Sequence, residues 1–517
     1  MTFEIVFVLL SLLGMVAALV ADKMRPGMIL FSVVVLFLCA GILTPKEMLE
    51  GFSNKGMITV ALLFLVSEGI RQSGTLGQVI KKLLPQGKTT VFKAQLRILP
   101  SVAFISAFLN NTPVVVIFAP IIKHWAKSVN LPATKFLIPL SYVTILGGIC
   151  TLIGTSTNLV VHGMILEAGF EGFSMFELGK VGIFIAIAGI IYIFLFSKRL
   201  LPDARPDTAV PDEEVEEGEK LHRVEAVLGA RFPGINKKLK DFNFQRHYGA
   251  EVKEIKTRNG QRFVSNLEDV VLHEGDTLVV MADDTFIPTW GESSVFVLLT
   301  NGNEQDTTGK KTRWFALLLL VLMIVGATVG ELPVTKEMFP DIKLDMFFFV
   351  SITTIIMAWT NLFPARKYTK YISWDILITI ACAFAISKAM VNSGVADSVA
   401  KFIIGLSDDY GPHVLLAMLF IITNLFTELI TNNAAAALAF PLALSIASQL
   451  GVSPTPFFVV ICMAASASFS TPIGYQTNLI VQGIGNYKFT DFVRIGLPLN
   501  IITFLISIIL IPLIWNF

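Results

Sequence analysis

The chain has 517 residues, of which 54% are hydrophobic and only 15% are charged, and its formal net charge at pH 7 is +1. Its mean hydropathy of +0.70 lies far from the soluble average, which excludes a soluble globular protein and indicates a polytopic membrane protein. The sequence also contains no Walker A motif, zinc-ligand spacing or nucleophile elbow, so we predict neither a primary pump nor an enzyme.

Long apolar stretches follow one another along the chain. A transmembrane helix needs about 20 mostly apolar residues. The first stretch lacks a basic start and a small-residue cleavage site, so we expect a retained helix rather than a signal peptide. Four cysteines lie in apolar stretches without metal-binding spacing, and we expect them to pack in the core: Cys39, Cys150, Cys382 and Cys462. The ten stretches that we predict to cross the membrane are 3–21, 26–43, 57–70, 136–166, 178–197, 314–331, 343–360, 372–391, 456–484 and 494–515.

Two further apolar stretches, 98–122 and 412–447, are predicted to be re-entrant hairpins. If each enters and leaves the membrane on the same side, the short loops rich in Lys and Arg all fall on one side, as the positive-inside rule requires. The first hairpin then opens inward and the second outward. Both chain ends lie outside, and the region between the two halves lies in the cytoplasm.

Charged residues are concentrated between Lys198 and Arg313, which predicts a cytosolic insertion over residues 201–313. Its flanks, 204–220 and 301–313, are rich in Pro, Gly and polar residues and are typical of solvated linkers. Between them, short β-type runs are separated by Gly and Asn-Gly turns. We therefore expect a small α/β domain with its core over 221–285.

Three pairs of segments repeat at an offset of 320 or 321 residues. Each half has an odd number of crossings, so the halves must be inverted relative to each other. The predicted fold is an all-α polytopic membrane protein with about five transmembrane helices and one hairpin in each repeat, 1–200 and 314–517. The pairs are VSEGIRQSG (66–74) with ISKAMVNSG (386–394), SAFLNNTPVVVIFAP (106–120) with TELITNNAAAALAFP (427–441), and TLIGTSTNLVVHG (151–163) with TPIGYQTNLIVQG (471–483).

Inverted repeats with interrupted helices are the architecture of secondary transporters, whose site lies where the broken helices meet. We expect the broken helices to be 136–166 and 456–484. An irregular backbone in lipid leaves carbonyls and amides unpaired, at a cost of several kcal/mol each, unless it lines a cavity or meets an ion. Free carbonyls suit sodium, and amides at a half-helix N-terminus suit an anion.

On these motifs the chain resembles the divalent anion/sodium symporters of the ion transporter superfamily. The family's hairpin tips usually read Ser-Asn-Thr, and here they read Asn110-Asn111-Thr112 and Thr431-Asn432-Asn433. The resemblance implies two sodium ions, which are co-transported, and no organic cofactor. One sodium would meet Ser106, Asn110, Asn111 and the backbone at Gly154. The other would meet Thr427, the Ile430 carbonyl, Asn432 and the backbone at Pro472 and Gly474.

The resemblance also implies an oxyanion substrate between the tips, either a sulfate-like inorganic anion or a dicarboxylate. None of these motifs contains Arg or Lys, so binding would rest on neutral donors, helix dipoles and nearby sodium. We expect Thr477 and Asn478 to be more informative than Tyr475, whose Ile473-Gly474-Tyr475 segment only superficially resembles a potassium-channel filter. The expected substrate-binding residues are Asn111, Thr112, Ser156, Thr157, Asn158, Asn432, Asn433, Gln476, Thr477 and Asn478. The family further implies a homodimer and an elevator-type movement.

The insertion resembles the C-terminal ligand-binding domain of potassium-uptake regulators, the TrkA-C or RCK-C type. The similarity lies in GARFPGINKKLKDFNFQRHYGAEVKEIKTRNGQRF followed by LHEGDTLVVMADD. The usual nucleotide-binding companion with its Gly-rich turn is absent from the sequence, so we do not predict NAD binding. The domain either responds to a cytosolic small ligand or has a structural role. No nucleic acid polymer is expected as a partner.

Two alternatives to the symporter remain open: a cation/proton antiporter on the same scaffold, and a potassium transport or channel protein regulated by the insertion. Isolated ionisable residues in apolar segments are usually functional. Glu68 and Lys388 occupy equivalent repeat positions, so they either pair with each other or each face water at a helix end. Glu428 follows Thr427 and has no assigned role. For His162 we weigh proton coupling against a structural hydrogen bond.

Overall fold

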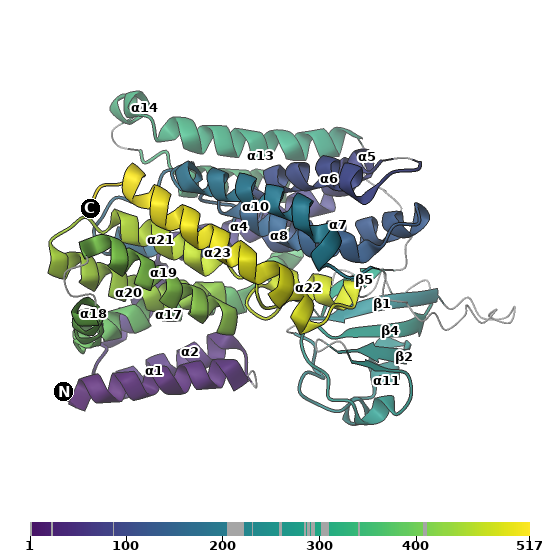
Figure 1. Ribbon diagram of the computed structural model, residues 1–517, viewed down its shortest axis with the longest axis horizontal. Coiled ribbons are helices and arrows are strands. Elements are labelled where there is room, and N and C mark those ends of the chain that lie inside the picture. Colours follow the sequence, from purple (N-terminus) through teal and green to yellow (C-terminus); the bar gives the residue numbers. More distant parts are fainter. Residues whose placement is uncertain are drawn as a thin grey trace, which may run out of the picture.

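The computed structural model describes residues 3–21, 24–85, 87–203, 222–229, 231–257, 261–283, 286, 290, 295–300, 310–339, 342–406 and 411–517. Most of these residues are helical, and one five-stranded sheet lies in the sequence between two sets of helices. Figure 1 shows both chain ends at one end of the molecule and the sheet at the other.

The first set of helices precedes the sheet. Several begin at a capping side chain. Asn54 and Thr90, for example, each accept a hydrogen bond from a backbone amide of the helix that follows. The helices are α1 (Phe3–Ala21), α2 (Pro26–Cys39), α3 (Pro45–Glu50), α4 (Lys55–Gln72), α5 (Thr75–Leu83), α6 (Val91–Ser106), α7 (Asn111–Ser128), α8 (Leu137–Gly148), α9 (Ser156–Glu167) and α10 (Gly179–Leu200).

The second set of helices follows the sheet and repeats the order of the first. Here too a side chain caps a helix, since Asp345 accepts from the amide of Phe348 at the start of α15. The helices are α13 (Lys310–Gly330), α14 (Pro333–Met338), α15 (Met346–Trp359), α16 (Tyr368–Tyr371), α17 (Trp374–Asn392), α18 (Val395–Leu406), α19 (Gly411–Leu429), α20 (Asn432–Leu450), α21 (Thr455–Ser466), α22 (Gln476–Gly485) and α23 (Phe489–Ile514).

Eight helices in the described part of the chain are long and apolar enough to cross a membrane, and α19 and α20 are among them. The predicted stretches 136–166 and 456–484 are each broken into two helices, α8 with α9 and α21 with α22. Large apolar side chains such as Leu10, Phe104 and Trp314 are exposed on the outside of the bundle, as expected for a surface that faces lipid. The chain is a multi-pass membrane protein.

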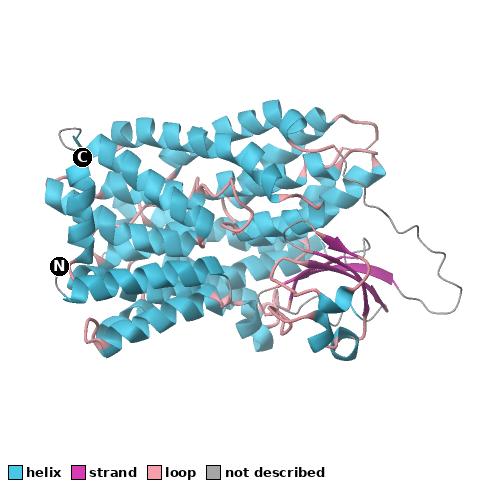
Figure 2. Ribbon diagram, turned by 60° about the horizontal axis from the view of Figure 1, so that its bottom comes forward, coloured by secondary structure: helices cyan, strands magenta, loops and turns pink. Residues whose placement is uncertain are grey.

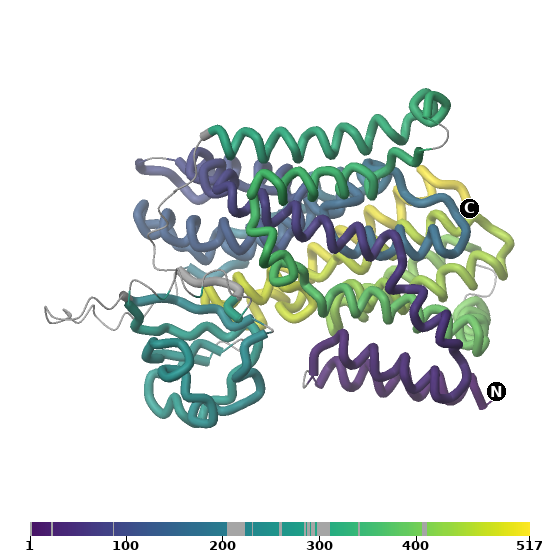
Figure 3. The backbone as a smooth tube through the Cα atoms, turned by 180° about the vertical axis from the view of Figure 1, so that it is seen from behind, coloured from purple at the N-terminus to yellow at the C-terminus, as the bar shows by residue number. Residues whose placement is uncertain are grey.

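We distinguish two groups of helices in the bundle, each with extensive contacts among its own members. An inner group consists of α6–α10 and α19–α23, in which α8 packs on α6, α7 and α22, and α21 on α19, α20 and α23. An outer group consists of α1, α2, α4, α13, α15 and α17, in which α2 packs on α17 and α4 on α15. In Figure 3, α13 runs along one edge of the molecule and α1 with α2 along the opposite edge. Contacts of α4 with α9 and of α17 with α20 join the groups.

The sheet has the strand order β3-β2-β4-β1-β5, and all neighbouring strands are antiparallel. Figure 2 shows the strands gathered at one corner of the helical bundle. An aromatic core covers the sheet, with Phe232, Phe242 and Tyr248 buried together. This core includes Phe286 and Phe296 of β5, so it extends beyond the range of 221–285 predicted for it, within the predicted insertion of 201–313. The elements are β1 (His222–Leu228), α11 (Phe244–Tyr248), β2 (Glu251–Lys256), β3 (Arg262–Phe263), β4 (Thr277–Ala282) and β5 (Phe296–Thr300).

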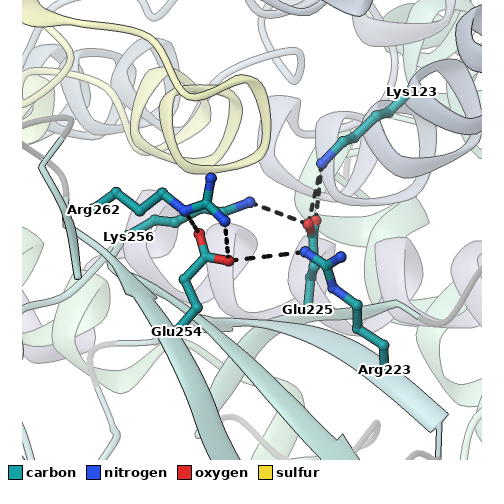
Figure 4. Close-up of polar contacts among 6 residues, drawn as sticks. All are labelled: Lys123, Arg223, Glu225, Glu254, Lys256 and Arg262. Carbon is teal, nitrogen blue, oxygen red and sulfur yellow. Dashed lines mark hydrogen bonds and ion pairs between the residues drawn. The ribbon is translucent and has the colours of Figure 1, made fainter. Parts of the chain in front are cut away.

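A partly buried cluster of charges joins the sheet to helix α7 (Figure 4). Lys123 Nζ of α7 lies 3.0 Å from Glu225 Oε2 of β1, and Lys256 Nζ of β2 lies 3.3 Å from Glu225 Oε1. Burial alone would raise the pKa of Glu225, but the charges of Lys123 and Lys256 outweigh burial and lower it to about 2. The glutamate is therefore ionised at neutral pH. The remaining members of the cluster are Arg223, Glu254 and Arg262.

The sheet domain also touches α22 and the segment before α17. A Cβ atom added at Gly483 of α22 would lie 2.6 Å from Thr277 Oγ1, so β4 rests directly on that helix. Arg231 Nη2 donates to the Ile372 carbonyl at 3.1 Å, two residues before α17. The domain thus contacts both the inner and the outer group of helices.

Candidate functional site

Two hairpins and two loops build the candidate site at equivalent positions of the repeats. Helices α6 and α7 meet at the first tip (residues 106–112), and α19 and α20 meet at the second tip (residues 427–433); each tip includes the last residues of the first helix and the first residues of the second. The first loop (residues 149–155) separates α8 from α9, and the second loop (residues 467–475) separates α21 from α22.

Each loop is joined to the tip of its own repeat by an equivalent threonine. Thr151 Oγ1 donates to the carbonyl of Ala107, and Thr471 Oγ1 donates to the carbonyl of Glu428 at 3.0 Å. The same hydroxyls accept from the amides of Gly154 and Gly474 at 3.2 and 3.4 Å. The sequence repeat is therefore also a repeat of hydrogen bonds.

Equivalent asparagines brace the two loops from within. Asn158 Nδ2 donates to the carbonyl of Thr151 at 2.9 Å, and Asn478 Nδ2 donates to the carbonyls of Ser468 and Thr471 at 2.9 and 3.2 Å. Both asparagines are fully buried. We predicted them as substrate donors, but the structure shows their amide groups engaged in holding the loops.

Thr477 is held from the first repeat rather than left open to a substrate. Ser141 Oγ of α8 lies 2.9 Å from Thr477 Oγ1 and donates to Asn478 Oδ1 at 2.7 Å. Tyr142 on the same helix donates to the Phe469 carbonyl at 2.5 Å. Helix α8 thus positions the second loop across the repeat boundary, a role for which the sequence carries no repeat signal.

The carboxamide of Asn111 lies at the centre of the first tip–loop pair. One of its terminal atoms lies 2.7 Å from Ser106 Oγ, 2.9 Å from the Thr144 carbonyl and 3.3 Å from the Gly154 carbonyl, and the other lies 2.5 Å from the hydroxyl of Tyr475. With nitrogen toward the carbonyls, the amide satisfies them by hydrogen bonds. With oxygen toward them, Asn111 Oδ1 adds a fourth oxygen to those of Ser106, Thr144 and Gly154, and oxygens are the ligands that a hard cation prefers.

Three of the four residues predicted for the first sodium site come together, and the fourth lies elsewhere. Ser106, Asn111 and Gly154 come together as expected. Asn110 instead lines a narrow cavity, with Ser156, between the first tip and helices α4 and α13. A Cβ atom at Gly154 would lie 2.7 Å from the Cα of Gly148 and would also crowd its carbonyl, so only glycine fits this turn of the loop.

The second tip and loop form the equivalent pair. A Cβ atom at Gly474 would overlap the Thr427 carbonyl and Ser468 Oγ, which shows how closely the loop approaches the tip. Thr427 Oγ1 donates to the Ala465 carbonyl at 2.6 Å. The other residues predicted for this site are also buried. Ile430 and Asn432 belong to the second tip, and Pro472 belongs to the second loop.

Contacts between the repeats close the space between the tips. Thr112 Oγ1 of the first tip donates to Gln476 Oε1 of the second repeat at 3.3 Å. Ser156 and Thr157 of the first repeat donate through their hydroxyls to Asn433 Oδ1 of the second at 3.3 and 3.2 Å. Thr112 and Asn433 are equivalent positions, as are Ser156 and Gln476. The Thr112–Gln476 contact and the Asn433–Ser156 contact are therefore related by the repeat. These are the predicted substrate donors that do face each other.

Four helix N-termini meet at these contacts. Helix α7 packs on α22, and α9 on α20. Their first residues are Asn111, Gln476, Ser156 and Asn432. Each N-terminus carries unpaired amides and the positive end of a helix dipole, so the region between them favours a negative charge. The arrangement combines oxygens for cations with amides and hydroxyls for an anion.

Glu428 has a structural role that the sequence did not reveal. Its carboxylate accepts from the amides of Ser470 and Thr471, both at 2.8 Å, and from Asn500 Nδ2 at 2.7 Å. The equivalent residue of the first repeat is Ala107. In the second repeat a carboxylate therefore satisfies loop amides. A charge in an apolar span is the sequence signal for such a residue, but the signal does not show which amides the charge meets.

The ionisable residues of the outer helices are not arranged as one hypothesis expected. Glu68 is bonded to Arg71, with the two side chains 2.6 Å apart, and to Gln72. The proposed pairing of Glu68 with Lys388 is therefore wrong. His162 lies against Gly172, where a Cβ atom would overlap its ring.

The paired tips, the broken helices and the multi-pass bundle define a membrane transporter of the secondary type. A search of protein families matches the chain to the family described as "Citrate transporter" over residues 16–446, with a second match over 342–516. The chain belongs to this family, which confirms the superfamily expected from the tip motifs. It also confirms that the protein is a transporter and not an enzyme.

Known relatives agree with this assignment. An uncharacterized transporter of Synechocystis sp. is 31% identical over 94% of this chain and 93% of its own length. A probable sodium/sulfate cotransporter of Chlamydomonas reinhardtii is 23% identical over 93% of this chain and 85% of its own length. The crystal structure of the YdaH transporter of Alcanivorax borkumensis matches with a TM-score of 0.52 and 12% identity over 90% of this chain and 87% of that one. This last likeness concerns the fold alone.

Proposed function

We propose that the protein is a sodium-coupled symporter of a divalent oxyanion, either a sulfate-like inorganic anion or a dicarboxylate. The family is described by citrate transport, and one relative is named a probable sodium/sulfate cotransporter. The observation that carries the proposal is the group of three oxygens around the Asn111 carboxamide, Ser106 Oγ and the carbonyls of Thr144 and Gly154, which lies beside helix N-termini suited to an anion.

Two sodium sites follow from the two tip–loop pairs. The first uses Ser106 and Asn111 with the carbonyls of Thr144 and Gly154. Oxygens of this kind are the ligands that hard cations prefer. The second, at equivalent positions, uses the predicted set of Thr427, the Ile430 carbonyl, Asn432, Pro472 and Gly474.

The anion binds between the tips, where it replaces the contacts that now close this space. Thr112 and Gln476 on one side, and Ser156 and Asn433 on the other, are freed to face it. These residues are neutral, so the anion depends on helix dipoles and on the nearby sodium ions for its electrostatic stabilisation. That dependence couples the anion to sodium, since neither ion binds well without the other.

The inner group of helices carries both tips and both loops, and we propose that it moves as an elevator against the outer group, within a homodimer. Short Lys- and Arg-rich loops favour a cytoplasmic sheet domain and chain ends on the outside. We propose that the sheet domain is of the TrkA-C or RCK-C type, which its sequence resembles. Its contacts with α7 and near α17 offer a route by which a cytosolic small ligand regulates movement.

Uptake by the purified protein in proteoliposomes tests this function. We expect uptake of labelled sulfate or succinate only when sodium is present, and loss of this sodium-dependent uptake in Asn111→Ala and in Asn432→Ala. Asn392→Ala serves as the control, because Asn392 lies on α17 and donates to the Ile42 carbonyl, away from both tips. Proton-driven exchange of cations would instead support an antiporter.

A further inference from the structure

Tyr475 and Thr155 occupy equivalent positions of the two repeats, 320 residues apart, yet they contact each other. The hydroxyl of Tyr475 lies 3.0 Å from Thr155 Oγ1, and both side chains are buried. Two equivalent residues meet only where the pseudo-twofold axis passes between them. The pair therefore lies on the axis that relates the two candidate cation sites.

The symmetry is broken by the size of the two side chains. Threonine is too short to reach beyond the axis, whereas Tyr475 reaches across it to the carboxamide of Asn111, 2.5 Å away. Asn111 is fully buried and belongs to the first tip. The second repeat thus places one hydroxyl against the Asn111 amide, on the side opposite the oxygens of Ser106, Thr144 and Gly154.

The two orientations of the Asn111 amide place different demands on Tyr475. When the amide nitrogen faces the Thr144 and Gly154 carbonyls, its oxygen must accept from the tyrosine hydroxyl. When the amide oxygen faces the carbonyls, its nitrogen must donate to that hydroxyl. A hydroxyl can do either, because it is both donor and acceptor. Only the second orientation presents the oxygen cluster to a cation.

We propose that Tyr475 is a positioning residue that links the orientation of the Asn111 amide to Thr155, and so couples sodium binding at the first site to anion binding between the tips. This inference rests on the proposed symport function. Without a cation, the tyrosine proton points at Asn111. When sodium enters, the amide turns, its nitrogen donates to Tyr475, and the tyrosine proton turns to Thr155 Oγ1.

The change at Thr155 reaches the anion site directly. Thr155 is the residue before α9, and the next two residues, Ser156 and Thr157, hold Asn433 of the opposite tip. A reversed hydrogen bond at Thr155 therefore acts on the N-terminus of the helix that closes the anion site. Sodium at the first site and anion binding between the tips share this one chain of hydrogen bonds.

Tyr475→Phe tests the proposal, because it keeps the ring and removes only the hydroxyl. The cation-binding orientation then leaves a buried amide nitrogen without an acceptor, whereas the cation-free orientation leaves only a carbonyl oxygen without a donor. Buried N–H groups tolerate the loss less well. We expect the sodium concentration for half-maximal uptake to rise about tenfold. We expect the maximal rate at saturating sodium to change less than about twofold, a split that a general folding defect does not produce.

Tyr487→Phe is the matched control, since Tyr487 is also buried in the inner group and donates to the Thr134 carbonyl at 2.5 Å, away from both tips. It should leave the half-saturating sodium concentration unchanged. If Tyr475→Phe does not fold, Thr155→Val removes the axis partner instead, and a smaller rise is expected.

The two levels of the proposal fail differently. Wild-type uptake that ignores sodium overturns the symport function and this inference with it. Sodium-dependent wild-type uptake with an unchanged half-saturating concentration in Tyr475→Phe, or in Thr155→Val where the first variant does not fold, overturns the role of Tyr475 alone.

Discussion

Glu428→Gln is expected to loosen the second loop. The carboxylate accepts from the amides of Ser470 and Thr471 through its two oxygens, and from Asn500. A glutamine has one oxygen, so whichever way it turns, an N–H group faces one of these donors. Hydrogen bonds to charged groups contribute about 1.5–3 kcal/mol, and a buried unpaired N–H costs about 1–3 kcal/mol. We therefore expect a loss of about 2–4 kcal/mol in the stability of the inner group.

The apparent melting temperature of the purified protein in detergent, with and without sodium, measures this loss. Glu428→Gln should lower it by roughly 5 °C and reduce the stabilisation by sodium, because the second cation site includes the same loop. Glu251→Gln is the control, since Glu251 and its partner Lys253 are both more than half exposed and such pairs contribute less than about 1 kcal/mol. Equal shifts in the two variants would refute the role assigned to Glu428.

Two further substitutions test the loop geometry and the docking of the sheet domain. Gly474→Ala places a methyl group on the Thr427 carbonyl and should abolish uptake while the protein is still expressed; Gly14→Ala, whose Cβ meets no atom within 4 Å, should transport normally. Lys123→Met leaves Glu225 with one lysine partner fewer, at a cost of about 1–3 kcal/mol. Hydrogen exchange in β1 should then speed up, whereas Lys240→Met, which removes an exposed lysine, should leave it unchanged.

The fold was largely predictable because the sequence contains an internal repeat that covers both sets of helices. Apolar length indicates helices, and the two copies of Ile-Gly followed by Thr-Asn mark where helices break. Length alone does not give the number of membrane crossings. Stretches 136–166 and 456–484 each contain two shorter helices, and the second hairpin has helices of 19 residues each.

The site was predictable only in part, because sequence spacing reports the backbone better than it reports side-chain partners. Ser106, Asn111 and Gly154 come together as the tip motif implied. Tyr475 is expected to be less informative than Thr477 and Asn478, yet its hydroxyl crosses between the repeats to reach Asn111. Asn478 was ranked above it but is occupied in bracing the second loop.

The reason for these differences is physical. A residue that acts within its own repeat recurs at the equivalent position of the other repeat, so a comparison of the two repeats reveals it. Tyr475 and Glu428 act where the repeats differ, opposite Thr155 and Ala107, so internal comparison assigns them no partner. Their roles depend on contacts across the pseudo-twofold axis and between tip and loop, which only the three-dimensional arrangement provides.

The most direct test of sodium coupling is anion accumulation driven by sodium alone. Proteoliposomes that contain the protein are prepared with equal concentrations of labelled sulfate or succinate on both sides, and a sodium gradient is imposed. Symport predicts that one of these anions becomes concentrated on the low-sodium side, and that reversing the gradient reverses the accumulation. Anion levels that stay equal whatever the sodium gradient, or a flux of rubidium in their place, would contradict it.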